Sequence, residues 1–193
     1  PKRPEAICLI FERFSVPWRA GSSPPSPEFD RAPSRFIAIA RASCASGDKA
    51  PSDIPAQSNR AVIAYTAAVK GAFKGLPTVI GGIEASLRRL AHYDYWDNKV
   101  RRSILVDSKA DMLLFGMAES ALTSLARRMH AGESIAQITN IRGTAYIAKD
   151  CPEDAIELPT FETVADDPEA YNRAFRLATG QANPYSGKSL VQP

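Results

Sequence analysis

A short apolar strand that ends in two glycines constrains the fold of this chain more than any other feature. Residues 78–82 read Thr-Val-Ile-Gly-Gly. In the preceding segment, residues 62–73, apolar side chains recur at helical spacing, and Gly75 and Pro77 then supply the stop signals of a helix. A helix followed by a short apolar strand and then by glycine predicts an α/β unit.

Similar signals predict further elements along the chain. Short apolar runs predict strands at 6–11, 36–40, 103–107, 112–115 and 143–148. Helical spacing predicts helices near 58–74 and 117–131, and a third helix after Asp167, with Asp167 as N-cap and Pro168 at the first helical position. Short apolar strands that alternate with helices predict a Rossmann-like, mostly parallel sheet with helices on both faces.

Composition divides the chain into three parts. Residues 1–56 are rich in proline and serine, which predicts loop or extended linker around partial first strands. Residues 57–150 carry the α/β signals, and residues 151–193 read as a helical extension.

Composition also excludes several classes of protein. The formal net charge is only +3, and no basic face is apparent, so a nucleic-acid partner is not expected. No window approaches the ~20 apolar residues of a membrane span. The three cysteines are far apart without a CxxC pair, which predicts the reduced thiols of a cytoplasmic protein.

A dense run of functional groups follows the two glycines. Ligands of α/β sheets bind outside the carboxyl ends of strands, so this connection and the turn after the next strand are the candidate ligand or interdomain face. The candidate residues are Gly81, Gly82, Glu84, Arg88, Arg89, His92, Tyr93, Asp94, Tyr95, Trp96, Arg101, Arg102 and Glu119.

Two interpretations of this run remain open. In the first, it grips an anionic ligand or a partner domain, because the guanidinium fork of arginine suits phosphate and carboxylate. In the second, it is a short solvated helix at 84–91 and a charged surface loop, with Trp96 in the core. His92 and Asp94 alone are too few for a metal site, and Ser86 lacks a GxSxG frame, so neither a metal nor a catalytic residue is predicted.

A long block of the sequence carries a resemblance to a known family. VIGGIEASLRRLAHYDYW, followed by DNKVRRSILVDSKADMLLFGMAESAL, resembles the N-terminal domain of the YgiQ family of radical SAM proteins. The later stretches IRGTAYIA, LPTFETV and ANPYSGKSLVQP resemble the same family in the same order. The likeness covers about residues 57–193.

The resemblance implies a longer enzyme of which this chain is a fragment. The barrel domain of that enzyme would hold a 4Fe-4S cluster on a CxxxCxxC triad and cleave S-adenosylmethionine, and residues 151–193 would lead towards it. No such triad exists here, so we expect neither cofactor in this chain, and no activity from it alone.

The same resemblance bears on cobalamin. Rossmann-like cobalamin-binding domains precede some radical SAM barrels, and Gly81-Gly82 and the segment from Phe115 to Glu119 occupy matching places. The motif DxHxxG is missing, which speaks against cobalamin binding through a histidine ligand.

The sequence therefore favours the N-terminal α/β accessory domain of a YgiQ-like protein, which would pack on the barrel of the same protein and line its ligand entrance. The alternatives are a stand-alone cobalamin- or nucleotide-binding module and a purely structural interdomain domain.

Overall fold

The computed structural model describes residues 6–10, 39–40, 60–183 and 186–193, with side chains from residue 60 onwards. The expected loop character of residues 1–56 lies mostly outside this part of the chain. The strands are β1 (Ala6–Ile10), β2 (Ile39–Ala40), β3 (Val79–Ile80), β4 (His92–Asp94), β5 (Lys99–Arg101), β6 (Met112–Leu114), β7 (Thr144–Ala148), β8 (Ile156–Glu157) and β9 (Leu190–Gln192). The helices are α1 (Ala61–Ala72), α2 (Gly82–Leu87), α3 (Ile104–Ser108), α4 (Glu119–His130), the 3-10 turn η1 (Ile135–Gln137), α5 (Phe161–Asp166) and α6 (Pro168–Gly180).

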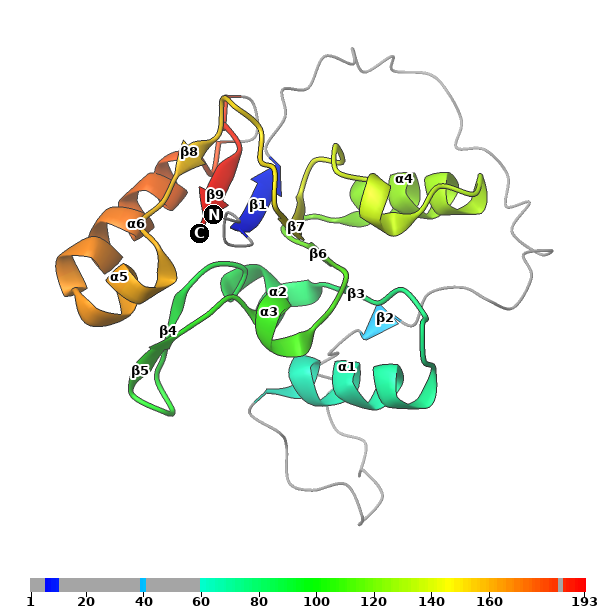
Figure 1. Cartoon of the computed structure of the whole chain (residues 1–193), viewed down its shortest axis with the longest axis horizontal. Coiled ribbons are helices and arrows are strands. Elements are labelled where there is room, and N and C mark those ends of the chain that lie inside the picture. The colour runs from blue at the N-terminus through cyan, green and yellow to red at the C-terminus, as the bar shows by residue number, and fades with distance from the viewer. Residues whose placement is uncertain (1–5, 11–38, 41–59, 184–185) are drawn as a thin grey trace.

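A seven-stranded sheet with the order β2-β3-β6-β7-β1-β9-β8 forms the centre of the structure. Helices cover both of its faces, with α4 on one side and α1, α2 and α3 on the other (Figure 1). The expected α/β architecture with two covered faces is therefore confirmed.

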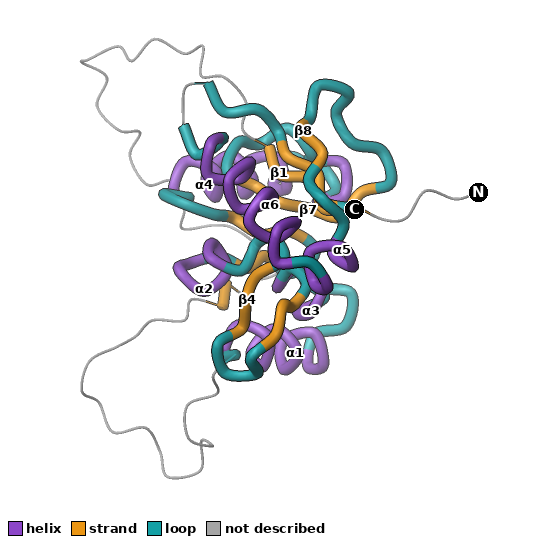
Figure 2. Tube along the Cα trace, turned by 90° about the vertical axis from the view of Figure 1, so that its left-hand side faces the viewer, coloured by secondary structure: helices purple, strands orange, loops and turns teal. Residues whose placement is uncertain are grey.

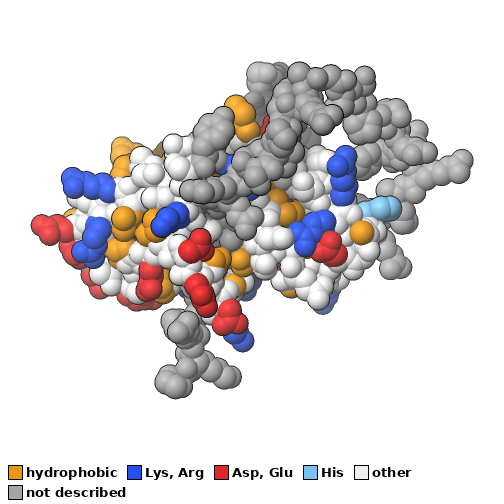
Figure 3. Space-filling view, turned by 90° about the horizontal axis from the view of Figure 1, so that it is seen from above, with side chains coloured by type: hydrophobic (Ala, Val, Ile, Leu, Met, Phe, Trp, Pro, Cys, Tyr) orange, Lys and Arg blue, Asp and Glu red, His pale blue; other side chains and the backbone are white. Residues whose placement is uncertain are grey.

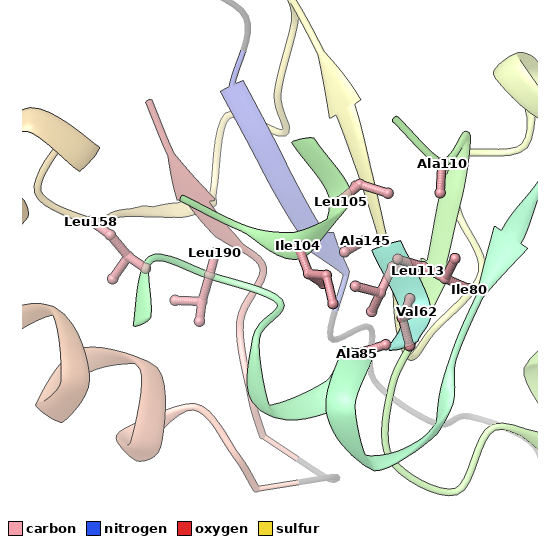
Figure 4. Packing of buried hydrophobic residues seen from close by; sticks show 10 residues of the cluster. All are labelled: Val62, Ile80, Ala85, Ile104, Leu105, Ala110, Leu113, Ala145, Leu158 and Leu190. Atoms are coloured by element: carbon pink, nitrogen blue, oxygen red, sulfur yellow. The ribbon is translucent and has the colours of Figure 1, made fainter. Parts of the chain in front are cut away.

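Neighbouring residues of the central strands serve opposite faces of the sheet. Ile80 and Leu113 join the core cluster that also contains Val62 of α1 and Ile104 of α3 (Figure 4). Val79, next to Ile80, belongs instead to the cluster beneath α4. This alternation explains why residues 78–80 and 112–115 read as continuous apolar runs, since each run must fill two cores.

The direction of the strands differs from the expectation. β3 runs parallel to β2 and to β6, but β7, β1 and β9 are joined by antiparallel pairings, and β8 is parallel to β9. The described strands thus form a mixed sheet, with three parallel and three antiparallel pairings, rather than a mostly parallel, Rossmann-like one. An apolar run has the same composition in either direction, so its sequence does not encode the direction of pairing.

Capping residues explain both a correct and a wrong assignment. Asp167 accepts a hydrogen bond from the backbone N–H of Glu169, and Pro168 opens α6, as expected. The strand that the sequence predicts at 103–107 is wrong, because the Ser103 hydroxyl accepts from the N–H of Leu105 and starts α3. An N-cap serine can therefore turn a short apolar run into a helix, whose Leu105 is fully buried.

The segment between α2 and α3 contains an antiparallel hairpin outside the main sheet. Its strands β4 and β5 pair His92 with Arg101, and Asn98 lies in the turn in the left-handed conformation, with a φ of 49°. Figure 2 shows the hairpin close to α1. The hairpin thus brings the charged stretch next to the start of α1.

Two further observations concern the oxidation state of a cysteine and the length of the apolar helices. Cys151 is disulfide-bonded, which corrects the expectation that all of the thiols are reduced. None of the helices in the described part of the chain is both long and apolar enough to cross a membrane.

Candidate functional site

A crevice of about 1000 Å³ opens at one edge of the main sheet. The parallel strands β3 and β6 both end at this edge, and β7, which is antiparallel to β6, begins there. The N–H of Phe115 donates to the carbonyl of Gly143 at 2.9 Å, which joins the turn after β6 to the start of β7. The crevice therefore lies outside the carboxyl ends of two parallel strands.

Five segments line the crevice. One face of α4 contributes Ser120, Ser124 and Arg128, and the loop before β7 contributes residues 140–143. The end of α2 contributes Ser86 and Arg89, the turn after β6 contributes residues 115–117, and Ala182 follows α6. Small side chains dominate the α4 wall, which leaves room for a ligand.

Glycines shape the turns that follow β3 and β6, the second of which lines the crevice. Gly82 has a φ of +88° and Gly116 a φ of +71°, a region that other residues rarely adopt. The Ser86 hydroxyl accepts a hydrogen bond from the N–H of Gly116 at 3.3 Å and holds the two turns together. Gly81 is extended instead, and a Cβ there would lie 3.3 Å from the carbonyl oxygen of Leu114.

Arg89 is the charged residue of the expected set that lines the crevice. Its guanidinium lies over the ring of Phe115, 5.1 Å from the ring centroid, and its Nη1 donates to the carbonyl of Ser86. Its Nε is buried and has no hydrogen-bond partner among the described residues. Burial lowers the pKa of the Arg89 guanidinium, because desolvation disfavours its charged form.

Arg88 and Arg89 have different partners. The helix expected at 84–91 does not include them, because α2 ends at Leu87 and Arg88 is its C-cap. Arg88 forms an ion pair with Glu84 one turn earlier, with Nη1 and Oε1 3.2 Å apart. Oε2 of the same carboxylate accepts the N–H of Val62 at 3.2 Å. Glu84 therefore links α2 to the start of α1 instead of facing the crevice.

The acidic residues of the hairpin form an ion network with Arg60, which precedes α1, and with Arg101 of the hairpin itself. Asp94 is buried, and its Oδ2 lies 3.1 Å from Nη2 of Arg60 and 3.8 Å from Nε of Arg101. Asp97 pairs with the same two arginines, and its contact to Nη1 of Arg101 is 2.8 Å. Arg101 also reaches Asp107 of α3 at 3.3 Å.

The remaining charges of the stretch extend this network. Arg102 lies 3.5 Å from Asp107, and Lys99 lies 3.7 Å from Asp97. Figure 3 shows the same pattern on one face of the whole molecule, where basic and acidic side chains are intermixed. Most charges of the hairpin thus hold α1, the hairpin and α3 together.

Electrostatics in the hairpin follow from this pairing. Burial alone would raise the pKa of Asp94, but hydrogen bonds from Arg60 and from the N–H of Trp96 outweigh it, and the pKa is lowered. His92 is half-buried and contacts the carbonyl of Leu90 through Nδ1 at 3.2 Å. Burial lowers the pKa of His92, so its ring is held neutral over a wider pH range.

The aromatic residues of the hairpin are exposed. Tyr95 and Trp96 form an edge-to-face pair with ring centroids 6.1 Å apart, and Trp96 is 67% exposed, which differs from the interpretation that places it in the core. The Tyr93 hydroxyl donates to Asn98 across the turn, and the Tyr93 N–H donates to the hydroxyl of Tyr171 on α6 at 3.2 Å.

Other residues of the crevice are not singled out by sequence reasoning. Arg128, Asn140 and Arg142 line it, and they belong to α4 and to the loop before β7. The available signal was the stretch IRGTAYIA, which contains Arg142 and Gly143. Glu119, which the sequence assigns to this face, is exposed at the first position of α4, and its neighbour Ser120 lines the crevice instead.

The described residues offer no metal site of their own. Within residues 60–183 and 186–193, no group of three or more His, Cys, Asp and Glu side chains is placed to hold a metal ion. These residues therefore do not fit the ligand set of an iron–sulfur cluster, which uses several thiolates.

Comparison with known proteins identifies relatives of the chain. Residues 46–193 match the family model described as radical SAM N-terminal. A UPF0313 protein of Geobacter sulfurreducens is 51% identical over 140 residues, which cover 71% of this chain and 23% of the relative. A UPF0313 protein of Clostridium botulinum (strain ATCC 19397 / Type A) is 49% identical over 136 residues, with 69% and 21% covered. One of Thermotoga neapolitana is 44% identical over 134 residues, with 69% and 24% covered.

These relatives are much longer than the chain. The aligned segment spans about 23% of the Geobacter sulfurreducens protein and about 21% of the Clostridium botulinum protein. No solved structure matches the chain.

Proposed function

The chain belongs to the family of radical SAM N-terminal domains, and from this premise we propose that it is the accessory domain of a longer radical SAM protein. In this proposal the crevice edge of the sheet packs on the barrel and lines the entrance for its ligand. The 4Fe-4S cluster and S-adenosylmethionine belong to the barrel, whose chemistry is radical generation. The present domain contributes binding and orientation.

The observation that carries the proposal is the exposed apolar surface around the crevice. Ile83 and Leu87, one turn apart on α2, are 81% and 72% exposed, and Met117 after β6 is 95% exposed. The hydrogen bond between Gly116 and Ser86 brings α2 and this turn together. Large apolar side chains that gather beside a crevice are typical of an interaction surface.

The occupant of this surface is a further part of the same protein. The relatives contain more than three quarters of their length outside the aligned segment, which is ample for a barrel domain. The paired charges of the hairpin support the same arrangement, because they hold the hairpin in place and leave Tyr95 and Trp96 available for contact.

Photo-crosslinking in the full-length protein tests the proposal. A benzophenone amino acid placed at Leu87 should crosslink to the barrel, and mass spectrometry would identify the peptide. The matched control is Phe73, which is 60% exposed just after α1. It lies in the segment that leads to the start of β3, whereas the crevice lies beyond the end of that strand. Equal crosslinking from both positions, or none from Leu87 to the barrel, would overturn the proposal.

The alternatives make different predictions in the same experiment. A stand-alone cobalamin- or nucleotide-binding module would give no intramolecular crosslink from Leu87. A purely structural domain would give the crosslink, but substitutions inside the crevice would leave the activity of the full-length protein unchanged. A cytoplasmic location remains a prediction, and it must accommodate the disulfide of Cys151, since disulfides persist mainly in oxidising compartments.

A further inference from the structure

The crevice contains a partly buried cation, Arg89, that has no counter-charge among the residues that the structure describes. No carboxylate of the described residues lies within ion-pair distance of Arg89, whereas Arg88, Arg101 and Arg102 of the same stretch all have acidic partners. The Nε of Arg89 is buried and unpartnered within the described part of the chain, and its guanidinium contacts a single carbonyl and the face of Phe115. Removing a charge from water is costly unless the charge is paired, so this arrangement points to an absent anion.

The other lining residues suit an anion that carries an apolar body. Three of the lining residues are arginines and none of the described lining residues is acidic. The charge of Arg128 is already used, because its guanidinium pairs with Glu133 at 2.6 Å. Ser86 and Ser120 add hydroxyls, while Phe115, Met117 and Ile141 supply apolar wall.

The start of α4 adds a weaker attraction at the same place. α4 is 12 residues long, and its N-cap Ala118 makes no side-chain hydrogen bond to the first turn. Uncapped N–H groups at the start of a helix favour negative charge. The first turn contributes Ser120 to the crevice that Arg89 also lines, so its N–H groups lie close to the crevice.

We propose that the crevice binds a small molecule through an oxyanion, a phosphate or a carboxylate, and that Arg89 is the residue that holds the oxyanion. The apolar body of the ligand lies against Phe115 and Ile141. The inference deepens the ligand-entrance role proposed above and rests on it. It also gives the guanidinium a role, since its fork can donate two parallel hydrogen bonds to an oxyanion.

Calorimetric titration of the complete protein at low ionic strength tests this inference with two probes. Phenyl phosphate represents the phosphate ligands and benzoate the carboxylates, and each combines an oxyanion with a small apolar ring. Saturable binding of either probe to the wild type is expected, and the preferred probe identifies the anion. Arg89→Gln should weaken that binding about ten-fold or more, because a charge-assisted hydrogen bond is lost.

The matched control is Arg127→Gln. Arg127 is an exposed arginine of α4 that does not line the crevice, so its loss should change the affinity by no more than about two-fold, through screening of long-range charge. If Arg89→Gln fails to fold, Ser120→Leu blocks the crevice from the exposed side of α4 and should also abolish binding. No saturable binding of either probe to the wild type, or binding that survives both variants, would overturn the inference.

This result is separable from the test of the accessory-domain role. Crosslinking from Leu87 to the barrel reports docking alone, whereas the titration reports the oxyanion alone. Crosslinking without probe binding would therefore reject the ligand and keep the domain assignment.

Discussion

The backbone N–H of Val62 donates a hydrogen bond to Oε2 of Glu84, over a distance of 3.2 Å. This bond joins the first turn of α1 to α2, whose end lines the crevice. Oε1 of the same carboxylate pairs with Arg88, so one side chain satisfies a helix N-terminus and an ion pair at once. Arg60, the N-cap of α1, makes no side-chain cap of its own.

Replacing Glu84 should therefore destabilise the protein. Glu84→Ala removes the acceptor at the N-terminus of α1, and we expect a loss of about 1–2 kcal/mol in the free energy of unfolding. Glu84→Gln keeps an acceptor oxygen and should restore part of the loss. Urea unfolding measures both, with the exposed Glu153→Ala as control. An effect of Glu84→Ala no larger than that of the control would contradict the capping role.

Asp94 should make the stability depend on pH in the acid range. Its pKa is lowered in the folded state by Arg60 and the N–H of Trp96, which overcome the effect of burial. The folded state thus binds this proton more weakly than the unfolded state. The stabilisation is complete above the ordinary pKa, about 4, and is lost as the pH falls through the lower folded value.

A variant isolates this contribution. The difference in unfolding free energy between wild type and Asp94→Asn should be constant from about pH 7 to about pH 5 and should shrink towards pH 3. Urea unfolding at several pH values measures it, and the exposed Asp154→Asn should show no such trend. A difference that stays the same down to pH 3 would show that the paired carboxylate does not contribute as described.

Two glycines should respond to alanine with opposite signs. Gly82 has a φ of +88°, and a Cβ there would meet no other atom within 4 Å, so Gly82→Ala costs backbone strain alone, about 1–2 kcal/mol. Gly71 lies inside α1 with equally open space, and Gly71→Ala should stabilise the protein by about 0.5–1 kcal/mol. Thermal unfolding of the two variants compares them directly, and a stabilising Gly82→Ala would rule out the left-handed turn.

Removing the charge of Arg89 should not destabilise the protein in the absence of ligand. Arg89→Met keeps an unbranched side chain over Phe115 and relieves the desolvation of an unpaired cation, so the melting temperature should stay the same or rise. Arg88→Met instead breaks the pair with Glu84 and should lower the unfolding free energy by up to about 1 kcal/mol. A larger loss for Arg89→Met than for Arg88→Met would mean that Arg89 is structural.

The exposed aromatic pair of the hairpin should matter for docking rather than for folding. Trp96 is 67% exposed, so Trp96→Ser should change the unfolding free energy by no more than about 0.5 kcal/mol. In the full-length protein the same variant should reduce the crosslinking yield or the activity, because aromatic side chains are enriched at interfaces. Loss of stability without any change in the full-length protein would assign Trp96 to the hairpin alone.

Much of the local structure could be predicted from the sequence because its causes are local. Asp167 and Pro168 predict the start of α6, and Gly75 and Pro77 mark the stop of α1, since capping and backbone restriction act within a few residues. The strand before Gly81 and its place at a crevice edge follow from the same kind of signal. The pair between Arg88 and Glu84 was foreseeable too, because its partners are one helical turn apart.

The direction of strand pairing, the lining of the crevice and the ion pairs of the hairpin depended on contacts between segments that are distant in the sequence. The antiparallel pairing of β7 with β6 made the sheet mixed, and it brought residues 140–143, which precede β7, to the crevice that α4 also lines. Asp94 meets Arg60 across 34 residues, which assigned most hairpin charges to a structural network.

By itself, then, the sequence determined the strand that ends before Gly81-Gly82 and the helices α1, α4 and α6, and it predicted the edge at which a ligand would lie. Only the tertiary structure decided that Arg89 is the arginine of this stretch left without a carboxylate among the described residues. Periodicity and capping report free energies that a segment has on its own, whereas the charge balance of a side chain depends on what the folded chain places beside it.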